Sequence, residues 1–396
     1  MKKSLSVASL FAAAAAIAWS QLAKRVELPA PFATESANNR PQVVERPRGA
    51  ELTVPAGFKI EEVAAAFERP RIMIPGSSGE LLLSDSVAAG AVYVLQDKNK
   101  DGKYEEKKAL LEKLDRPFGI AWWKDYLYVA ETTSLKRYKY NKRAMTVGAG
   151  EEVVAMKDYG QGHWTRAVQF DAKGEKMYLT IGSKSNVDGG EPKDRAAIHR
   201  YNPDGSGHEL FAEGTRNPTS IHFYPGTNRL FAAVQERDLL GDDLVPDYFT
   251  GIKQGGFYGW PFAYIGPNED PRRKGERPEL VKKTIVPDLP LQAHVAALDF
   301  AFYTGKMFPA KYRGGVFLAL HGSWNRSKRV GYSVVYIPFK DGKISGQPEE
   351  FLKGWMLAPD KREVWGRPVG IFPLPDGSML VTDDGGNKIW RITYKG

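Results

Sequence analysis

One histidine and several arginines stand directly before short hydrophobic runs of the kind that form β-strands. His163 precedes one such run, Arg216-Asn217 precedes the next, and Arg367 precedes the last. A neutral imidazole can act as a general base near pH 7. An arginine offers a planar fork of donors for carboxylate oxygens, and an asparagine offers both donors and an acceptor. These residues predict a site that binds an anionic ligand next to a base.

Each of these residues also has a structural interpretation. A lone histidine most often hydrogen-bonds a loop carbonyl, and Arg216 could form a salt bridge between neighbouring sheets. The position that the candidates share, immediately before a strand, favours the functional interpretation. Arg116 and Arg166 occupy the same position in other repeats, where carboxylates of the adjacent repeat could neutralise them. Arg69 is a weaker candidate for the site than Arg116 and Arg166.

The recurrence of these residues predicts the fold. From Arg69 the copies follow at Arg116, Arg166, Arg216, His294 and Arg367, in steps of 47, 50, 50, 78 and 73 residues. A period near that of one four-stranded blade is typical of a β-propeller. We therefore predict an all-β chain folded as a six-bladed β-propeller, with the six strand starts around one end of a central channel. Cationic groups at most of them would make that end positive.

The runs that follow the six starts support the same fold. Several copies continue, after a turn, into a second run rich in β-forming residues, at residues 81–85, 126–131, 177–182 and 379–383. The last blade ends at residues 388–394, close to the C-terminus. A strand-like segment at residues 58–63 precedes the first copy, so we expect it to complete the last blade and close the ring, which hides sheet edges.

An acidic loop follows the fourth strand start. Its carboxylates, Glu236, Asp238, Asp242 and Asp243, suit a hard cation such as Ca²⁺. A solvated turn or a set of ion pairs is the alternative. A second stretch, residues 97–102, imitates the start of an EF-hand loop, but position twelve would be Lys108 rather than Glu, so a polar hairpin is the favoured interpretation.

Two glycine-rich loops carry aromatic residues, at residues 255–261 and 321–326. Aromatic faces on loops above a channel suit a planar cofactor or a sugar ring. For at least half of these aromatics we expect only packing within the loop.

The N-terminus predicts an exported protein. Residues 1–20 combine Lys2-Lys3, an alanine-rich apolar run and small-residue cleavage sites, as in a signal peptide, with an uncleaved membrane anchor as the alternative. Residues 21–50 contain four prolines among polar residues and are interpreted as a linker, which leaves residues 51–396 for the propeller. The chain has no cysteine, which excludes thiol catalysis, and the periplasm tolerates that absence. A periplasmic or secreted location makes nucleic acid a poor partner for the net charge of +9.

With these segments in view, residues 52–394 resemble the glucose/sorbosone dehydrogenase family, and most closely its L-sorbosone dehydrogenase-like branch. The motifs that carry the resemblance are residues 214–218, 236–238 with 241–243, 258–261, and 366–368 with 375–377. The resemblance implies a six-bladed propeller that holds pyrroloquinoline quinone (PQQ) over the channel, with Ca²⁺ bridging the quinone and the protein.

The resemblance also implies roles for individual residues. His163 would take a proton from the C1 hydroxyl of a sugar while hydride passes to the quinone, and Arg216 would stabilise the charge growing on the quinone oxygen. Asn217 and Arg367 would hold the cofactor, with Arg166 and Arg116 as weaker candidates. The substrate would be an aldose or a sugar aldehyde, and an external acceptor, a cytochrome or a quinone, would take the electrons.

The chain departs from the glucose-oxidising branch in three places. Gly162 precedes His163 where that branch has Asp, and Arg237-Asp238 replaces Gly-Pro in the metal loop. The lysine that holds the cofactor in that branch has no counterpart at Gly322-Ser323, and Arg326 is the candidate substitute.

Two other function classes stay open at this point. A Ca²⁺-dependent propeller lactonase would need carboxylate and Asn ligands that converge on the channel axis, whereas the strand starts offer mostly Arg and His. A binding propeller without catalysis would use the same ring of residues structurally.

Overall fold

The computed structural model describes residues 27–76 and 79–396, and the chain divides into two units, residues 1–30 and 31–396. The predicted signal peptide therefore lies outside the described residues. Within the described ranges, no helix is long and apolar enough to cross a membrane.

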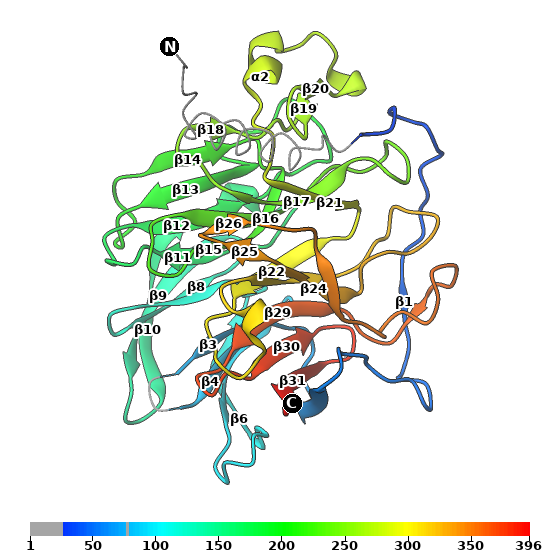
Figure 1. The fold of residues 1–396 in the computed structure, drawn as a ribbon. Helices are drawn as coiled ribbons and strands as arrows, with labels where there is room; N and C mark the ends of the chain where they lie inside the picture. Colours follow the sequence, from blue (N-terminus) through cyan, green and yellow to red (C-terminus); the bar gives the residue numbers. More distant parts are fainter. Residues whose placement is uncertain (1–26, 77–78) are drawn as a thin grey trace, which may run out of the picture. The chain divides into compact units, whose positions relative to one another are not determined.

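The unit 31–396 contains six antiparallel sheets that form a six-bladed β-propeller (Figure 1). The innermost strands contact one another in a closed ring, from the first blade around to the sixth and back to the first. From the channel outward, the first three blades are β3 (Pro70–Pro75), β4 (Leu81–Asp85), β5 (Gly90–Gln96), β6 (Glu106–Leu114); β7 (Ile120–Trp123), β8 (Tyr126–Ala130), β9 (Ser134–Asn141), β10 (Thr146–Ala155); and β11 (Val168–Phe170), β12 (Met177–Ile181), β13 (Ala197–Tyr201), β14 (Glu209–Glu213).

The other three blades repeat this order. They are β15 (Asn217–Phe223), β16 (Leu230–Gln235), β17 (Pro246–Gly251), β21 (Leu289–Ala293); β22 (Ala297–Phe302), β23 (Val316–Leu320), β24 (Ser333–Ile337), β27 (Glu349–Leu352); and β29 (Pro368–Pro373), β30 (Met379–Asp383), β31 (Lys388–Tyr394), β2 (Phe58–Ala64). The predicted fold class is confirmed, and each of the six predicted starts lies within four residues of an innermost strand.

The ring closes as predicted. The N-terminal strand β2 pairs with the C-terminal strand β31, with Phe58 opposite Tyr394 and Ile60 opposite Ile392. Phe58 also packs edge-on against Phe308 and Phe351 of the fifth blade. The first and last strands of the propeller thus complete one blade, and this pairing closes the ring.

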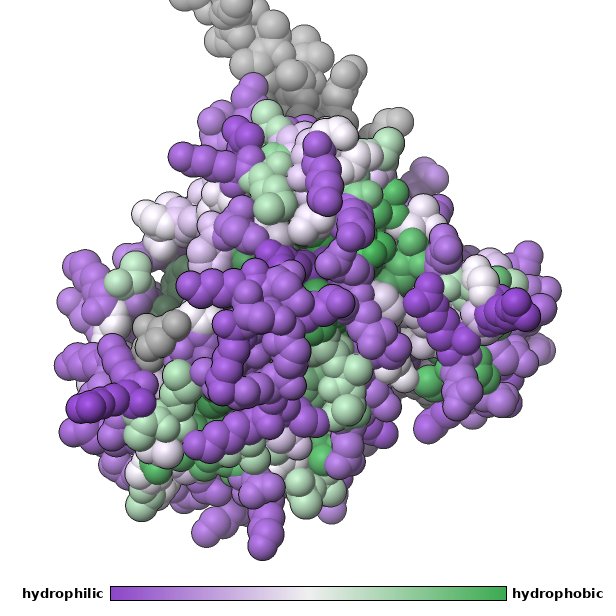
Figure 2. Space-filling model, turned by 90° about the horizontal axis from the view of Figure 1, so that it is seen from below, coloured by the Kyte–Doolittle hydropathy of each residue, from purple (hydrophilic) through white to green (hydrophobic). Residues whose placement is uncertain are grey.

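The core lies between neighbouring blades. Strands β4, β12, β23 and β30 are buried along their whole length, because both faces of each sheet meet another sheet. This explains why their sequences are continuous apolar runs rather than alternating ones. The face drawn in Figure 2 is mostly hydrophilic, with hydrophobic side chains in small groups between polar ones.

One long insertion accounts for the step of 78 residues. Residues 252–288 leave the fourth blade between β17 and β21 and contain β18 (Gly256–Phe257), the hairpin β19 (Ala263–Tyr264) and β20 (Asn268–Glu269), and the short helix α2 (Pro278–Lys283) (Figure 1). β18 adds to the third blade as a parallel neighbour of β14. The insertion thus ties the third and fourth blades together.

Residues 31–50 of the predicted linker are bound to the propeller. Their short strand β1 (Gln42–Val43) pairs in parallel with β28 (Glu363–Val364). Phe32 N donates to Leu240 O at 2.8 Å, and Asn39 N donates to Trp324 O at 2.8 Å. We call residues 31–50 the N-terminal arm.

Candidate active site

The starts of the third, fourth and sixth blades contribute residues to a cavity of about 600 Å³. His163, Arg216 and Arg367, predicted as site residues, line it together with Asp238, which the sequence predicts as a metal ligand. The other lining residues are Arg40, Pro41, Gly162, Lys184, Ser185, Asn186 and Trp324. The structure therefore brings together the histidine and the two arginines on which the sequence argument depends most.

His163 is fixed by the loop that follows β12. Its Nδ1 lies 2.8 Å from Ser183 O and 3.0 Å from Ser183 Oγ. Because a carbonyl oxygen only accepts, Nδ1 carries the proton and Nε2 keeps its lone pair. Burial, and next the positive charge of Arg216, lower the pKa of His163 to about 3. The imidazole is therefore neutral at pH 7 and can accept a proton at Nε2.

Two glycines allow this arrangement. Gly162 has φ of +79°, and a Cβ there would lie 2.3 Å from Lys184 O. A Cβ on Gly182 would lie 2.6 Å from both His163 Cβ and Asn217 Oδ1. Only a residue without a side chain fits at either position, so the close approach of His163 to the β12 end is encoded by these glycines.

Arg216 is held by a network on three sides and is only 5% exposed. Its Nη1 donates to Glu236 O at 2.6 Å, and its Nη2 lies 3.0 Å from Asn186 Oδ1 and 3.2 Å from Asp238 Oδ2. The side-chain oxygen of Asn186 also accepts a hydrogen bond from Asp238 N at 2.9 Å, and its backbone carbonyl accepts one from Trp260 Nε1 at 2.9 Å. The guanidinium is thereby oriented before any ligand arrives.

Asp238 links this network to the fifth strand start. Its Oδ1 lies 3.3 Å from His294 Nδ1, and His294 Nε2 lies 3.0 Å from Gly241 O. Burial would raise the pKa of Asp238, but His294 and Arg216 beside it hold that pKa below its usual value. Asp238 is therefore a carboxylate that balances the charge of Arg216.

Arg367 enters the cavity from the opposite part of the ring. Its Nε donates to His321 O at 3.1 Å and its Nη2 to Gly322 O at 3.2 Å. Behind it, His321 and Arg71 both bind Asp384, at 2.7 Å and 2.6 Å. Arg367 has no ion pair with a carboxylate among the described residues, so its charge is available to a ligand.

The other predicted cofactor residues do not line the cavity. Asn217 is buried and donates from Nδ2 to Gln235 Oε1 at 3.0 Å, while its Oδ1 has no partner among the described residues.

Arg166 is fully buried, and burial lowers its pKa to about 9. Its guanidinium donates to backbone carbonyls of the loop that carries His163, including His163 O at 2.8 Å. Arg116 starts the second repeat outside the cavity lining, and Arg326 is paired with Asp243 at 2.5 Å. Arg166 thus positions the loop of His163 rather than facing a ligand.

The four carboxylates predicted as Ca²⁺ ligands form ion pairs and hydrogen bonds in this structure, which is the alternative that the sequence left open. Glu236, Asp238, Asp242 and Asp243 do not converge, because each faces a different partner. Glu236 pairs with the fully buried Arg237, which also binds Asp270 at 3.1 Å. Asp242 accepts from Ser327, and Asp243 from Arg326. In the part of the chain that the structure describes, the carboxylates that do cluster are Asp97, Asp101 and Glu105, in the hairpin that the sequence likened to an EF-hand.

Lys184, Ser185 and Asn186 line the cavity but were not predicted. They follow a recognisable strand, so a closer reading of strand ends could have found them. Trp324 belongs to a loop that the sequence analysis had noted for its aromatics. Arg40 belongs to the N-terminal arm, and no repeat or motif indicated it.

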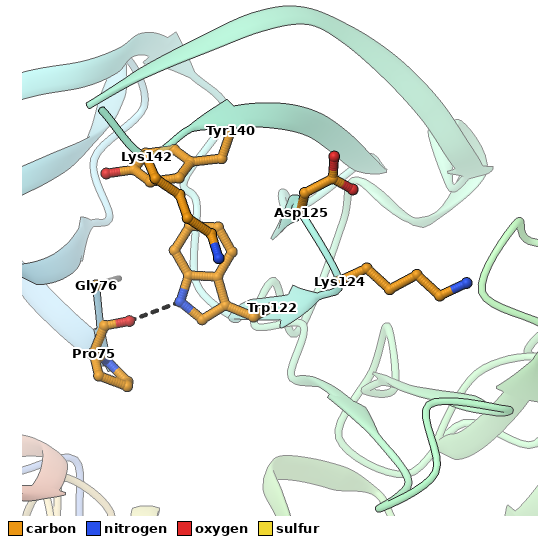
Figure 3. Close-up of a pocket in the computed structure, with 7 residues that line it drawn as sticks. All are labelled: Pro75, Gly76, Trp122, Lys124, Asp125, Tyr140 and Lys142. Atoms are coloured by element: carbon orange, nitrogen blue, oxygen red, sulfur yellow. Dashed lines mark hydrogen bonds between the residues drawn. The ribbon is translucent and has the colours of Figure 1, made fainter. Parts of the chain in front are cut away.

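A second, smaller cavity of about 210 Å³ contains none of the predicted site residues. It lies at the ends of β3 and β7, where Trp122 Nε1 donates to Pro75 O at 2.7 Å (Figure 3). Tyr140 packs against Trp122 with ring centroids 5.0 Å apart. The chemistry expected from the sequence is concentrated at the other cavity.

Comparisons with known proteins agree with this fold. An uncharacterized protein of Borreliella burgdorferi is 31% identical over an alignment of 363 residues that covers 87% of this chain and 91% of that protein. A carbohydrate-active enzyme of family AA12 from Trichoderma reesei has a similar structure, with a TM-score of 0.76 and 20% identity over 90% of this chain and 100% of that chain. The PQQ domain of a pyranose dehydrogenase from Coprinopsis cinerea has a TM-score of 0.73 and 19% identity over 89% of this chain and 99% of that chain.

The family match itself spans the propeller. The TrAA12-like family matches residues 52–243 and 276–395, which include His163, Arg216 and Arg367 and leave out the N-terminal arm and part of the insertion. The chain therefore belongs to the TrAA12-like family.

Proposed function

We propose that this chain is a quinoprotein dehydrogenase that oxidises an aldose or a sugar aldehyde with PQQ as its cofactor. The observation that carries the proposal is the cavity in which a neutral His163 lies beside Arg216 and Arg367. The names of the structural neighbours, a carbohydrate-active enzyme and a PQQ domain of a pyranose dehydrogenase, support the same class.

The charges of the cavity fit this cofactor. PQQ is a planar tricarboxylic acid, and the lining residues Arg40, Lys184 and Arg367 are cations without a carboxylate ion pair among the described residues. Arg216, which is paired with Asp238, adds a fixed fork of donors. The volume of about 600 Å³ is within the usual range for ligand cavities, about 300 to 1,000 Å³. A planar anion with several carboxylates is therefore the ligand class that this donor set favours.

The residues divide the work as follows. His163 would accept the proton of the substrate hydroxyl at Nε2, because Nδ1 is already committed to Ser183 O. Arg216 would stabilise negative charge that develops near it, since Asn186 and Asp238 fix its guanidinium in advance. Arg367, Lys184 and Arg216 would hold the carboxylates. Bound PQQ would supply the two-electron oxidising chemistry that the side chains lack.

Calcium does not fit the acidic loop. Its four carboxylates are engaged by Arg237, Arg216, Ser327 and Arg326, so we assign no residue of that loop to Ca²⁺. The same observation weakens the lactonase alternative, which needs carboxylate and Asn ligands converging on the channel axis. The binding propeller without catalysis remains the competing proposal.

We also propose the finer points that the resemblance suggests. The substrate class is that of the L-sorbosone dehydrogenase-like branch, and an external cytochrome or quinone takes the electrons. Export to the periplasm or beyond is proposed from residues 1–20.

Ultraviolet–visible spectra with and without added PQQ and Ca²⁺, followed by dye reduction with a panel of aldoses and sugar aldehydes, test this function. The proposal expects a bound-quinone spectrum and sugar-dependent dye reduction that needs PQQ. A bound quinone without turnover on any of these sugars would favour the binding propeller. Lactone hydrolysis that needs Ca²⁺ and no quinone would favour the lactonase.

A further inference from the structure

The N-terminal arm runs along the propeller to the rim of the cavity. Besides the bond of Asn39 N to Trp324 O, Gln42 N donates to Arg362 O at 2.8 Å and Val44 N donates to Val364 O at 2.9 Å. The family match begins at residue 52, so the arm lies outside the part of the chain that the family shares.

A buried arginine fixes the arm next to the cavity. Arg329 is 2% exposed, and it donates to Asn39 O at 2.7 Å and to Asn39 Oδ1 at 2.6 Å. The amide of Asn39 donates in turn to Ser327 O at 2.9 Å and Arg326 O at 3.1 Å. Both ends of the Asn39 side chain are therefore bound to the loop after β23, which leaves little freedom for the residue that follows.

That residue is Arg40. Its carbonyl accepts from Arg362 Nε at 3.0 Å, and its guanidinium carbon lies 5.5 Å from the centre of the Trp324 ring. Both Arg40 and Trp324 line the cavity that also contains Arg216 and Arg367. Arg40 is exposed and has no ion pair among the described residues, so no carboxylate balances its positive charge at the rim of the cavity.

We propose that Arg40 is a ligand-binding residue: the N-terminal arm completes the cavity, and the Arg40 guanidinium pairs with a carboxylate of the bound anion. This inference rests on the proposed function, since PQQ is the anion considered. Arg216 is balanced by Asp238, whereas Arg40 is not, so Arg40 adds an unbalanced positive charge to those of Lys184 and Arg367. Asn39 acts as a positioning residue, because it sets where the Arg40 backbone lies.

The test is the affinity of the full chain for PQQ, measured by equilibrium dialysis. Arg40→Ala should raise the Kd about tenfold, the size expected for one charge-assisted pair in a partly exposed site. Arg48→Ala is the matched control, because Arg48 is an exposed arginine of the same arm that does not line the cavity. Asn39→Ala should raise the Kd in the same direction and by less, since it loosens the arm without removing the charge.

A second readout follows the arm itself. Exchange of the backbone amides of Asn39, Gln42 and Val44 should slow when PQQ binds to the wild type and should not slow in Arg40→Ala. Equal PQQ affinity for Arg40→Ala and Arg48→Ala would overturn the role of Arg40 and leave the proposed function standing. A wild-type chain that binds no PQQ would overturn both.

Discussion

Replacing His163 with glutamine should slow sugar oxidation strongly and leave quinone binding nearly unchanged. Glutamine keeps a side chain that can bond Ser183 but removes the lone pair that Nε2 holds in the neutral imidazole. A positioned general base typically contributes about 10²- to 10⁴-fold to such a step. Because burial and Arg216 lower the pKa of His163 to about 3, this histidine is a weak base, and we expect the lower end of that range. A loss of about 10²-fold in kcat corresponds to about 2.7 kcal/mol.

The assay is stopped-flow reduction of the PQQ-loaded protein by a good sugar substrate, with the Kd for PQQ measured separately. His208→Gln is the matched control, because His208 is exposed and bonds only His199. His163 is neutral above its pKa of about 3. Lowering the pH from about 8 to about 5 should therefore leave this base unprotonated and should not reduce kcat/KM through His163. Reduction by His163→Gln at nearly the wild-type rate would remove this residue from the mechanism and return it to a structural role in its loop.

Three further predictions concern the scaffold. Arg237→Met removes the ion pair of the buried Glu236 carboxylate and leaves Asp270 with Arg272 alone, so it should lower the free energy of unfolding by about 3 to 5 kcal/mol. Arg277→Met at an exposed pair should cost less than about 1 kcal/mol, and urea denaturation measures both. Burial lowers the pKa of His199 to about 4, so the unfolded chain binds more protons than the folded chain between about pH 6.5 and pH 4. The free energy of unfolding should therefore fall by about 3 kcal/mol for this group as the pH falls through that window. His199→Gln should make the free energy of unfolding less dependent on pH there. An unchanged pH dependence in that variant would contradict the low pKa assigned to His199. Gly162→Ala places a Cβ against Lys184 O at positive φ, so it should lower kcat by displacing the adjacent base, and a crystal structure with an unmoved loop would refute this reason.

Most of the fold could be predicted from the sequence because each blade repeats the same pattern. The runs predicted at residues 81–85 and 379–383 are strands β4 and β30 with those bounds, and the closing pair of β2 and β31 follows from a strand-like segment before the first repeat. The long insertion after β17 could be placed only by the step of 78 residues, because its short strands carry no periodic pattern.

The candidate site was predicted in part. His163, Arg216 and Arg367 converge because the repeat places equivalent strand starts around one ring. For the acidic loop the sequence left a Ca²⁺ site and a set of ion pairs open, because it does not show which carboxylates Arg237 and Arg326 reach within the fold. Arg40 could not be found, since its contact with the cavity depends on how Arg329 fixes Asn39, and the two residues are far apart in the chain.

The central claim is that this cavity holds a quinone that oxidises a sugar. Its most direct test is to mix the PQQ-loaded wild-type chain with aldoses and sugar aldehydes under anaerobic conditions and without a dye, while the absorbance of the bound quinone is followed. We predict that the quinone is reduced once per chain by at least one sugar of this class, and more slowly in His163→Gln. A chain that binds the quinone tightly and leaves it oxidised with every such sugar would contradict the account.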